Sequence, residues 1–205
     1  MSNRQGAMTR LLLVRHGQST WNVTGRWQGR ADPPLSATGE AQASAAAARL
    51  GPVDGVWSSD LVRARRTADL LRPPGVPLRL DPRLRERDVG AWTALTRDEI
   101  EVRHPRWLED GRRPEGWEPD DALVARACPA LQEVAAELSF GGTGIVVSHG
   151  GVIRAVAHHF GAEPAPVPNL GGVWLHVDGA AFVFGARTTL LDGLATPSPT
   201  VTAAD

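Results

Sequence analysis

Two short runs of apolar residues stand out in the hydrophobic pattern of the chain. Residues 10–15 (RLLLVR) and residues 144–148 (GIVVS) are continuous rather than alternating, and His-Gly follows each of them at once. Continuous apolar runs of this length are typical of central strands that are covered on both faces. Residues 55–58 (GVWS) predict another short strand. The pattern therefore predicts a buried and mostly parallel sheet.

Helical patterns separate these strands. Residues 36–50 predict an Ala-rich helix with Ser36 or Thr38 near its N-cap. Residues 61–71 carry apolar side chains at helical spacing and end before a Pro-Pro-Gly stop signal. Further helices are predicted over residues 121–138 and 151–160. Because strands and helices alternate, we expect an α/β fold with three layers, an α/β/α sandwich around a mostly parallel central sheet.

Two parts of the chain depart from this alternation. Residues 171–186 predict a hairpin, because Asp178-Gly179 is a strong turn signal between two β-rich runs. Residues 87–119 look irregular and contain Trp92, Trp107 and Trp117. This irregular, tryptophan-containing stretch predicts an inserted, lid-like segment.

Composition limits the classes of protein that fit. The 205 residues carry a formal net charge of −1, so no overall basic field favours nucleic acid or a membrane surface as a partner. No stretch approaches the roughly 20 apolar residues that span a bilayer. Cys128 is the single cysteine, which excludes an intrachain disulfide and fits a cytoplasmic protein.

The ends of the chain are unlike its middle. Residues 1–8 are small and polar, and residues 193–205 are rich in Pro, Thr and Ala. Such compositions are typical of flexible termini. We therefore expect a single domain over residues 9–192.

Chemically reactive residues gather where the predicted strands end. His16 and His149 each follow a central strand, and open α/β sheets bind ligands at the carboxyl ends of their strands. If these two strands are neighbours, both imidazoles face one crevice. Arg63 follows another strand, and its planar guanidinium suits a phosphate group. Glu86 is a candidate general acid. Metal binding by the two histidines is the alternative, although the nearby arginines would repel a cation.

Five motifs resemble those of one enzyme family. They are LLLVRHGQSTWN, WQGRADPPLSATGEAQA, SSDLVRARRTA, LRERDVGAW and VVSHGGVIRA, in this order over about residues 10–160. Together they resemble the histidine phosphatase superfamily, in the branch that includes cofactor-dependent phosphoglycerate mutases and related phosphatases. The resemblance implies the histidine phosphatase fold and phosphoryl transfer without a metal ion or another cofactor.

The resemblance also implies a role for each matched residue. His16 is the histidine that becomes phosphorylated, so one ring nitrogen must be unprotonated while the other donates to an acceptor such as a backbone carbonyl. Arg15, Arg63 and His149 form the phosphate pocket and stabilise the transferring phosphoryl group. Glu86 protonates the leaving alkoxide and then activates the attacking water.

Two weaker assignments complete the predicted phosphate site. The resemblance places the side-chain amide of Asn22 and the backbone N–H of Gly150 on the phosphate. Structural interpretations compete with some of these roles. Asn22 also suits the cap of a turn, Glu86 between two arginines suits a surface salt bridge, and the tryptophans of residues 87–119 suit a core as well as a substrate pocket.

Hydrolysis is favoured over mutase activity, because the chain departs from the pattern of the family's mutases. The expected substrate is a small phosphate ester of the phosphoglycerate, glucosyl-phosphoglycerate or sugar phosphate class. Mutases of the family tend to have a longer insertion and a Tyr near the proton donor, whereas this chain contains no Tyr. Family members also commonly have Glu-Gly after the Trp of LRERDVGAW, where Thr93 and Ala94 stand here. The segment PVPNLGGVW is similar to the corresponding stretch of actinobacterial glucosyl-3-phosphoglycerate phosphatases.

Two other functions stay open at the level of sequence. One is a cofactor-dependent phosphoglycerate mutase, and the other is a non-catalytic protein that binds phosphate esters. A homodimer is compatible with the family, although no interface can be read from the sequence.

Overall fold

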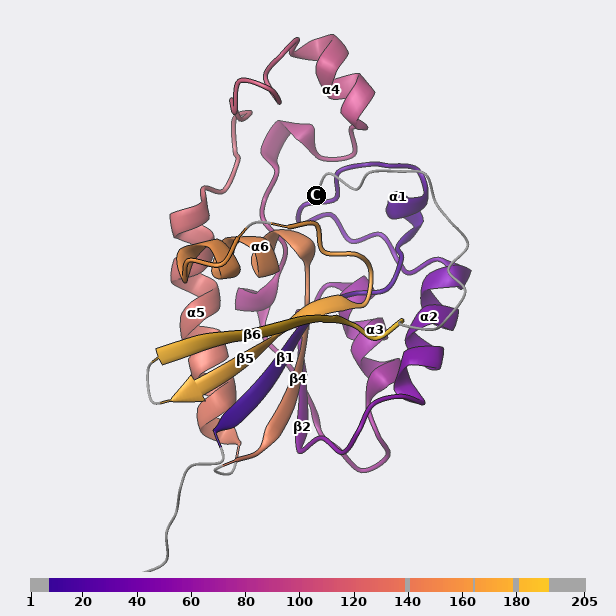
Figure 1. The fold of residues 1–205 in the computed structure, drawn as a ribbon. Coiled ribbons are helices and arrows are strands. Elements are labelled where there is room, and N and C mark those ends of the chain that lie inside the picture. The colour runs from indigo at the N-terminus through magenta and orange to yellow at the C-terminus, as the bar shows by residue number, and fades with distance from the viewer. Residues whose placement is uncertain (1–7, 139–140, 164, 179–180, 192–205) are drawn as a thin grey trace, which may run out of the picture.

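The computed structural model describes residues 8–138, 141–163, 165–178 and 181–191. Helices and strands alternate along most of the chain (Figure 1). The strands are β1 (Thr9–Arg15), β2 (Gly55–Ser58), β3 (Leu78–Leu80), β4 (Thr143–Ser148), β5 (Gly171–Asp178) and β6 (Ala181–Thr189). The helices are α1 (Thr20–Val23), α2 (Ala37–Ala47), α3 (Val62–Leu71), α4 (Arg97–Arg103), α5 (Asp120–Glu137) and α6 (Gly150–His159), with short 3-10 helices η1 (Pro82–Leu84) and η2 (Gly90–Trp92).

The strands join in one sheet with the order β3-β2-β4-β1-β5-β6. Strands β3, β2, β4 and β1 are parallel to one another, whereas β5 pairs antiparallel with β1 and with β6. The prediction of a mostly parallel sheet and the prediction of a C-terminal hairpin are both confirmed. Gly179 of the predicted turn lies outside the described residues. So do the predicted flexible termini, residues 1–8 and 193–205, apart from Met8.

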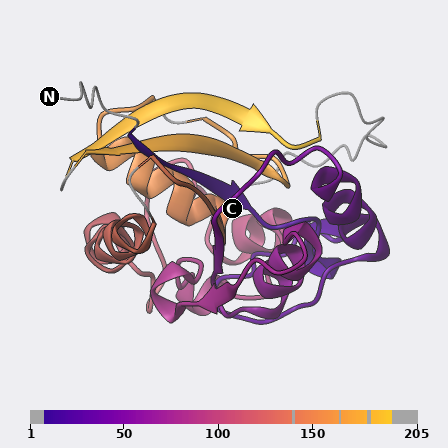
Figure 2. The same ribbon diagram turned by 90° about the horizontal axis from the view of Figure 1, so that it is seen from below.

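Helices cover both faces of the sheet (Figure 1 and Figure 2). Helices α5 and α6 lie on one face, and helices α2 and α3 lie on the other. Successive side chains of a strand point to opposite faces. Leu11 and Leu13 of β1 therefore pack in the core beneath α5 and α6, while Leu12 and Val14 pack in the core beneath α2 and α3. The predicted three-layer sandwich is confirmed.

Local signals set where the helices begin. Ser36, rather than Thr38, is the N-cap of α2, and its hydroxyl accepts from the N–H of Gly39 at 3.0 Å. Helix α6 begins directly after His149. The free N–H groups of its first turn consequently lie at the carboxyl end of β4.

Residues 87–119 are more regular than the sequence predicts. They contain η2 and α4, and α4 lies on the side of the molecule to which the parallel strands run (Figure 1). Trp92 and Ile100 are fully buried there in a small separate core with Trp27. The segment therefore has a hydrophobic core of its own, and its lid-like role stays a prediction.

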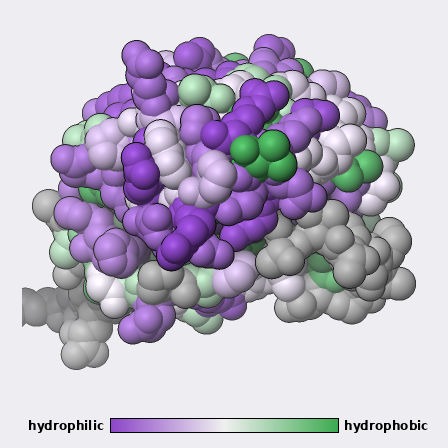
Figure 3. All heavy atoms as spheres, turned by 90° about the horizontal axis from the view of Figure 1, so that it is seen from above, coloured by the Kyte–Doolittle hydropathy of each residue, from purple (hydrophilic) through white to green (hydrophobic). Residues whose placement is uncertain are grey.

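Figure 3 shows the surface from the side on which α4 lies. This face is mostly hydrophilic, with isolated hydrophobic side chains. Across the described part of the chain, no helix is long and apolar enough to cross a membrane. Polar groups, rather than an apolar patch, are what this side of the molecule presents.

Candidate active site

The two histidines of the motifs lie side by side at the ends of neighbouring strands. Strands β1 and β4 are adjacent and parallel, with Arg15 opposite Ser148. His16 and His149 therefore follow at the same level of the sheet. Their ring centroids are 5.2 Å apart, and both rings are buried. The expectation that both imidazoles share one crevice depended on the strands being neighbours, and the strands are neighbours.

His16 is held in one tautomer. Its Nδ1 lies 2.7 Å from the carbonyl oxygen of Gly17, which only accepts, so Nδ1 carries the proton. Nε2 accepts a hydrogen bond from Nε of Arg63 at 3.2 Å. Burial lowers the pKa of His16 well below its usual value, and the charges of Arg63 and Arg15 lower it further. His16 is thus a neutral imidazole with its lone pair on Nε2, which is the state that an attacking imidazole requires.

Residues that sequence reasoning missed hold the backbone around His16. Thr67 on α3 accepts from the N–H of Gly17 at 3.0 Å. The side chain of Asn169 donates to the carbonyl of His16 at 3.0 Å. Thr67 lies in the motif SSDLVRARRTA and Asn169 in the segment PVPNLGGVW. Membership of these stretches was the available signal, because spacing alone cannot pair residues so far apart in sequence.

Two buried arginines flank His16. Arg63 is 0% exposed, and its terminal nitrogens donate to the carbonyls of Ala31 at 2.7 Å and Gly29 at 2.9 Å. Arg15 lies at the end of β1 and donates to a backbone carbonyl at 2.8 Å. These hydrogen bonds fix both guanidinium groups in place. Fixed positive charge in a site that excludes water is what stabilises a transferring phosphoryl group.

His149 is buried without a hydrogen-bond partner among the described residues. Both of its ring nitrogens are shielded from solvent, and neither makes a hydrogen bond. Burial lowers the pKa of His149 well below its usual value, and Arg63 and His16 act in the same direction. Buried polar atoms normally have a partner. The N–H of this neutral ring is therefore suited to an anionic oxygen of a ligand.

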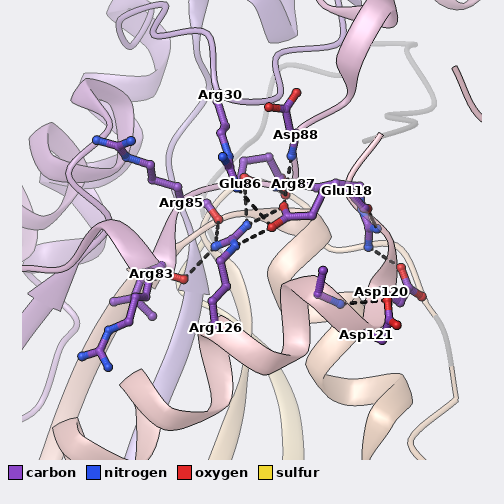
Figure 4. Close-up of polar contacts among 12 residues, drawn as sticks. Arg30, Arg83, Arg85, Glu86, Arg87, Asp88, Glu118, Asp120, Asp121 and Arg126 are labelled. Atoms are coloured by element: carbon purple, nitrogen blue, oxygen red, sulfur yellow. Dashed lines mark hydrogen bonds and ion pairs between the residues drawn. The ribbon is translucent and has the colours of Figure 1, made fainter. Parts of the chain in front are cut away.

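Glu86 is buried, with its carboxylate bound to the backbone. It is 6% exposed, and its two oxygens accept from the N–H groups of Arg87 at 2.7 Å and Gly151 at 3.0 Å. The side chain of Arg85 pairs with Asp60, and the side chain of Arg87 pairs with Asp120 (Figure 4). The interpretation of Glu86 as a surface salt bridge is therefore wrong.

Gly151 leaves the space that the Glu86 carboxylate occupies. A Cβ at this position would lie 2.3 Å from Oε1 of Glu86, which is far inside van der Waals contact. Gly151 also belongs to the first turn of α6, where N–H groups have no helical acceptor. Glu86 thus satisfies the start of α6 from a distant part of the chain.

The two weaker assignments have different outcomes. Gly150 is the first residue of α6, and a Cβ on it would lie 3.6 Å from Cδ of Arg15, so its backbone adjoins the arginine of the predicted phosphate pocket. Asn22 forms a capping box with Ser19, and its Oδ1 accepts from the N–H of Ser19 at 3.0 Å. The capping interpretation therefore applies to the oxygen of Asn22. Contact of its amide with phosphate stays a prediction.

A pocket of about 430 Å³ opens beside Glu86 and Gly151. The indoles of Trp27 and Trp117 form part of its wall, and these tryptophans also belong to the small core around Trp92. The tryptophans thus serve both as core and as pocket wall. Arginines 87, 113 and 154 supply positive charge to the lining.

Arg154 connects this pocket to the histidine pair. Its Nη1 lies 3.5 Å from the point that a Cβ on Gly150 would take, and Nε of Arg15 lies 3.7 Å from the same point. Arg154 therefore stands between the predicted phosphate site and the pocket. It lies in the motif VVSHGGVIRA, but no role was assigned to it from the sequence.

Positive charge around His16 comes from guanidinium groups. Within the ranges that the structure describes, no group of three or more histidine, cysteine, aspartate or glutamate side chains is placed to hold a metal ion. Arg15 and Arg63 are the charges that affect His16 most strongly.

Comparison with known proteins shows the family. Residues 11–172 match the histidine phosphatase superfamily (branch 1). The chain belongs to this superfamily. The matched range contains all five motifs, so the resemblance seen in the sequence is confirmed.

Two named phosphatases and a named mutase are similar over most of this chain. The glucosyl-3-phosphoglycerate phosphatase of Mycobacterium tuberculosis (strain ATCC 25618 / H37Rv) is 38% identical over 190 residues, or 83% of this chain and 85% of the relative. The metal-independent phosphoserine phosphatase of Arabidopsis thaliana is 36% identical over 167 residues, or 74% of this chain and 68% of the relative. A probable phosphoglycerate mutase of Escherichia fergusonii is 39% identical over 154 residues, or 70% of each chain.

A solved structure extends the likeness to three dimensions. The structure of a mycobacterial glucosyl-3-phosphoglycerate phosphatase in complex with VO3 matches with a TM-score of 0.77 at 34% identity. The match covers 86% of this chain and 96% of that chain. The histidine phosphatase fold is thereby confirmed.

This histidine phosphatase carries an alanine at a position where the family commonly has glycine. Ala94 has a φ of 68°, in the left-handed region that disfavours residues with a Cβ. Its N–H donates to the carbonyl of Trp27 at 2.8 Å, and the N–H of Trp27 donates to the carbonyl of Leu95 at 2.8 Å. These bonds hold Ala94 in the strained conformation, which explains the usual preference for glycine there.

Proposed function

We propose that this histidine phosphatase hydrolyses small phosphate monoesters through a phosphohistidine at Nε2 of His16, without a metal ion. The observation that carries the proposal is the state of His16, with the proton held on Nδ1 by Gly17 and the lone pair on Nε2 beside Arg63. Relatives named as phosphatases support hydrolysis. The proposed substrate is a small molecule of the cytoplasm, a compartment that the single cysteine supports.

In the first step, Nε2 of His16 attacks the phosphorus of the ester. A bond forms between Nε2 and phosphorus while the bond from phosphorus to the ester oxygen breaks. Glu86, as a carboxylic acid, gives its proton to the departing oxygen. Arg15, Arg63 and His149 donate hydrogen bonds to the other phosphoryl oxygens and stabilise their charge.

In the second step, a water molecule attacks the phosphohistidine. Glu86, now a carboxylate, accepts a proton from the water, and the bond from phosphorus to Nε2 breaks. Inorganic phosphate leaves, His16 returns to its neutral form, and Glu86 holds the proton for the next cycle. The backbone N–H groups of Arg87 and Gly151 hold the Glu86 carboxylate in place for this step.

The pocket beside Glu86 supports a leaving group that carries its own negative charge. Arg113 and Arg154 line it and suit a carboxylate, while Trp27, Val89 and Trp117 contribute apolar surface to the lining for an uncharged part of the substrate. We therefore propose a substrate of the phosphoglycerate class, including a glucosyl-phosphoglycerate, in preference to a plain sugar phosphate. The name of the M. tuberculosis relative supports this class.

Phosphate release in EDTA tests the reaction. Wild-type protein is expected to release phosphate from p-nitrophenyl phosphate and from 3-phosphoglycerate, and to gain a phosphoryl group during turnover. His16→Ala should lose both properties, because it removes the attacking nitrogen. His159→Ala, at an exposed position on α6, is the matched control and should keep both.

Two results would contradict the proposal. Release by His16→Ala at the wild-type rate would falsify the phosphohistidine route. Transfer of phosphate between the positions of phosphoglycerate, with little net release, would instead favour a mutase, as the name of the E. fergusonii relative suggests for that protein.

A matched pair of substrates tests the proposed class. 3-Phosphoglycerate and glycerol 3-phosphate differ in that a carboxylate replaces a hydroxymethyl group. Arg154→Gln should lower kcat/KM for 3-phosphoglycerate by about tenfold or more, because a charge-assisted hydrogen bond is lost. The value for glycerol 3-phosphate should change much less. Equal losses on both substrates would show that Arg154 does not recognise the carboxylate.

A further inference from the structure

The backbone that carries Glu86 is held from one side by Arg126 (Figure 4). Arg126 lies on α5, and its guanidinium donates to the carbonyls of Arg83 at 2.7 Å, Arg85 at 2.6 Å and Glu86 at 3.1 Å. Arg83 lies in the short 3-10 helix η1, and residues 85–88 have no regular secondary structure, so no strand ladder or α-helix satisfies the carbonyls of Arg85 and Glu86. Arginine suits the position because its planar fork carries several donors in fixed directions.

Glu118 completes this arrangement. Its Oε1 and Oε2 accept from Nε and Nη2 of Arg126 at 2.7 Å and 2.8 Å, which is a bidentate ion pair. Oε2 also accepts from the N–H of Asp88 at 3.2 Å. Burial alone would raise the pKa of Glu118, but the hydrogen bond and charge of Arg126 hold it below its usual value. The pair therefore stays ionised at neutral pH. Arg126 holds the carbonyls at the start of residues 83–88, and Glu118 holds the N–H of Asp88 at their end.

These contacts leave Arg126 no donor for a substrate. A guanidinium has five N–H groups, and the three carbonyls and the two oxygens of Glu118 use all of them. The side chains of Arg126 and Glu118 are also mostly buried. Any effect of Arg126 on the reaction must pass through the segment that it holds.

The position of the Glu86 carboxylate depends on that segment. One of its two donors is the N–H of Arg87, inside the held stretch, and the other is the N–H of Gly151 at the start of α6. If the backbone of residues 85–87 rotated, the Glu86 carboxyl would lose its hydrogen bond from the N–H of Arg87 and move away from the N–H of Gly151. Misplacement of a reacting group by about 1 Å can cost about a hundredfold in rate.

We propose that the ion pair between Arg126 and Glu118 positions Glu86 for proton transfer. The inference rests on the proposed function, in which Glu86 protonates the leaving oxygen. Arg126 and Glu118 are positioning residues that do not touch the substrate. Their loss should slow the cleavage of esters whose leaving oxygen needs a proton, and should spare esters whose leaving group departs as a stable anion.

Two aryl-containing esters of similar size provide the test. p-Nitrophenyl phosphate releases a stabilised anion, whereas benzyl phosphate releases an alkoxide that needs a proton. The measured quantity is kcat/KM, because it reports the steps up to the departure of the first product. Glu86→Gln should lower kcat/KM for benzyl phosphate by about a hundredfold or more. Arg126→Lys and Glu118→Gln should lower it by about ten- to a hundredfold, with little change for p-nitrophenyl phosphate.

Controls separate positioning from charge and from folding. Arg126→Lys keeps the charge but loses the planar fork, and Glu118→Gln keeps the size of the side chain if the lysine variant folds poorly. Arg79→Lys is the matched control, because the side chain of Arg79 pairs with Glu137 at half-exposed positions outside residues 83–88; it should behave as wild type on both esters. Combining Arg126→Lys with Glu86→Gln should add no further loss on benzyl phosphate.

The opposite results overturn the proposal. Equal losses on the two esters would show a general structural role for the ion pair. Wild-type values in both Arg126→Lys and Glu118→Gln, or an additive loss in the double variant, would show that Glu86 does not depend on the pair. Failure of the proposed function itself is distinguishable from these results. In that case, His16→Ala would not reduce phosphate release from either ester.

Discussion

Acidification should destabilise this protein through its two buried histidines. Burial, with the charges of nearby arginines, lowers the pKa values of His16 and His149 well below the usual 6.5. In the unfolded chain both imidazoles take up protons near that pH, whereas in the folded chain they stay neutral. The unfolded state therefore binds more protons, and the free energy of unfolding falls as the pH drops below about 6.5.

The size of this effect follows from proton linkage. One pH unit below the unfolded-state pKa, a histidine that stays neutral in the folded state lowers the free energy of unfolding by about 1.4 kcal/mol. The two histidines together lower it by about 3 kcal/mol at about pH 5.5. Domains of this kind are typically stable by about 5–15 kcal/mol, so the loss is large enough to measure. It is absent above about pH 7.5, where neither state binds these protons.

Urea denaturation across this pH range measures the effect, with tryptophan fluorescence as the signal. The free energy of unfolding falls between about pH 7.5 and pH 5.5, and His149→Asn should make this fall smaller by about 1.4 kcal/mol. The double variant His16→Asn with His149→Asn should remove about twice as much. Carboxylates titrate alike in all three proteins, so the comparison isolates the histidines. Parallel curves for wild type and His149→Asn would refute the reasoning, because His149 would then take up its proton in the folded state.

Three further predictions concern substitutions at single positions. Ala94→Gly should raise the free energy of unfolding by about 1 kcal/mol, because it relieves the φ of 68°; a lower urea midpoint would contradict this. Gly151→Ala should lower kcat/KM for benzyl phosphate by about tenfold or more, because the new Cβ would lie 2.3 Å from Oε1 of Glu86. A folded Gly151→Ala protein with the wild-type value would show that proton transfer tolerates a displaced carboxyl. Thr67→Val should lower the free energy of unfolding by about 1–3 kcal/mol, since it removes the acceptor of the Gly17 N–H. Thr67→Ser is the control, and an equal loss in that variant would assign the effect to packing instead.

Local patterns were sufficient for most of the secondary structure. The apolar runs before His16 and His149 predicted central strands, because a strand that is buried on both faces has no polar side to alternate with. Helix α4 was missed because its 7 residues show too little periodicity. The capping box of Thr96 and Glu99 at its start was the signal that could have found it.

The residue types of the candidate site were predictable, but their states were not. Sequence placed Glu86 beside two arginines and left open whether those charges reach it. In the folded chain, Arg85 and Arg87 pair elsewhere, and backbone N–H groups take their place. Asn22 likewise had two interpretations, and its capping box with Ser19 decided the role of its oxygen.

The sequence by itself determined most of the strands, most of the helices and the kinds of groups that meet at the sheet edge, because these depend on residues close together in the chain. Only the tertiary structure decided which groups touch. Arg126 reaches the carbonyl of Glu86 across 40 positions, and Asn169 reaches the carbonyl of His16 across 153. No local pattern links such residues, since a hydrogen bond between distant segments depends on how the helices and the sheet pack. The same packing removes water from His16 and His149, and desolvation is the largest cause of their lowered pKa values.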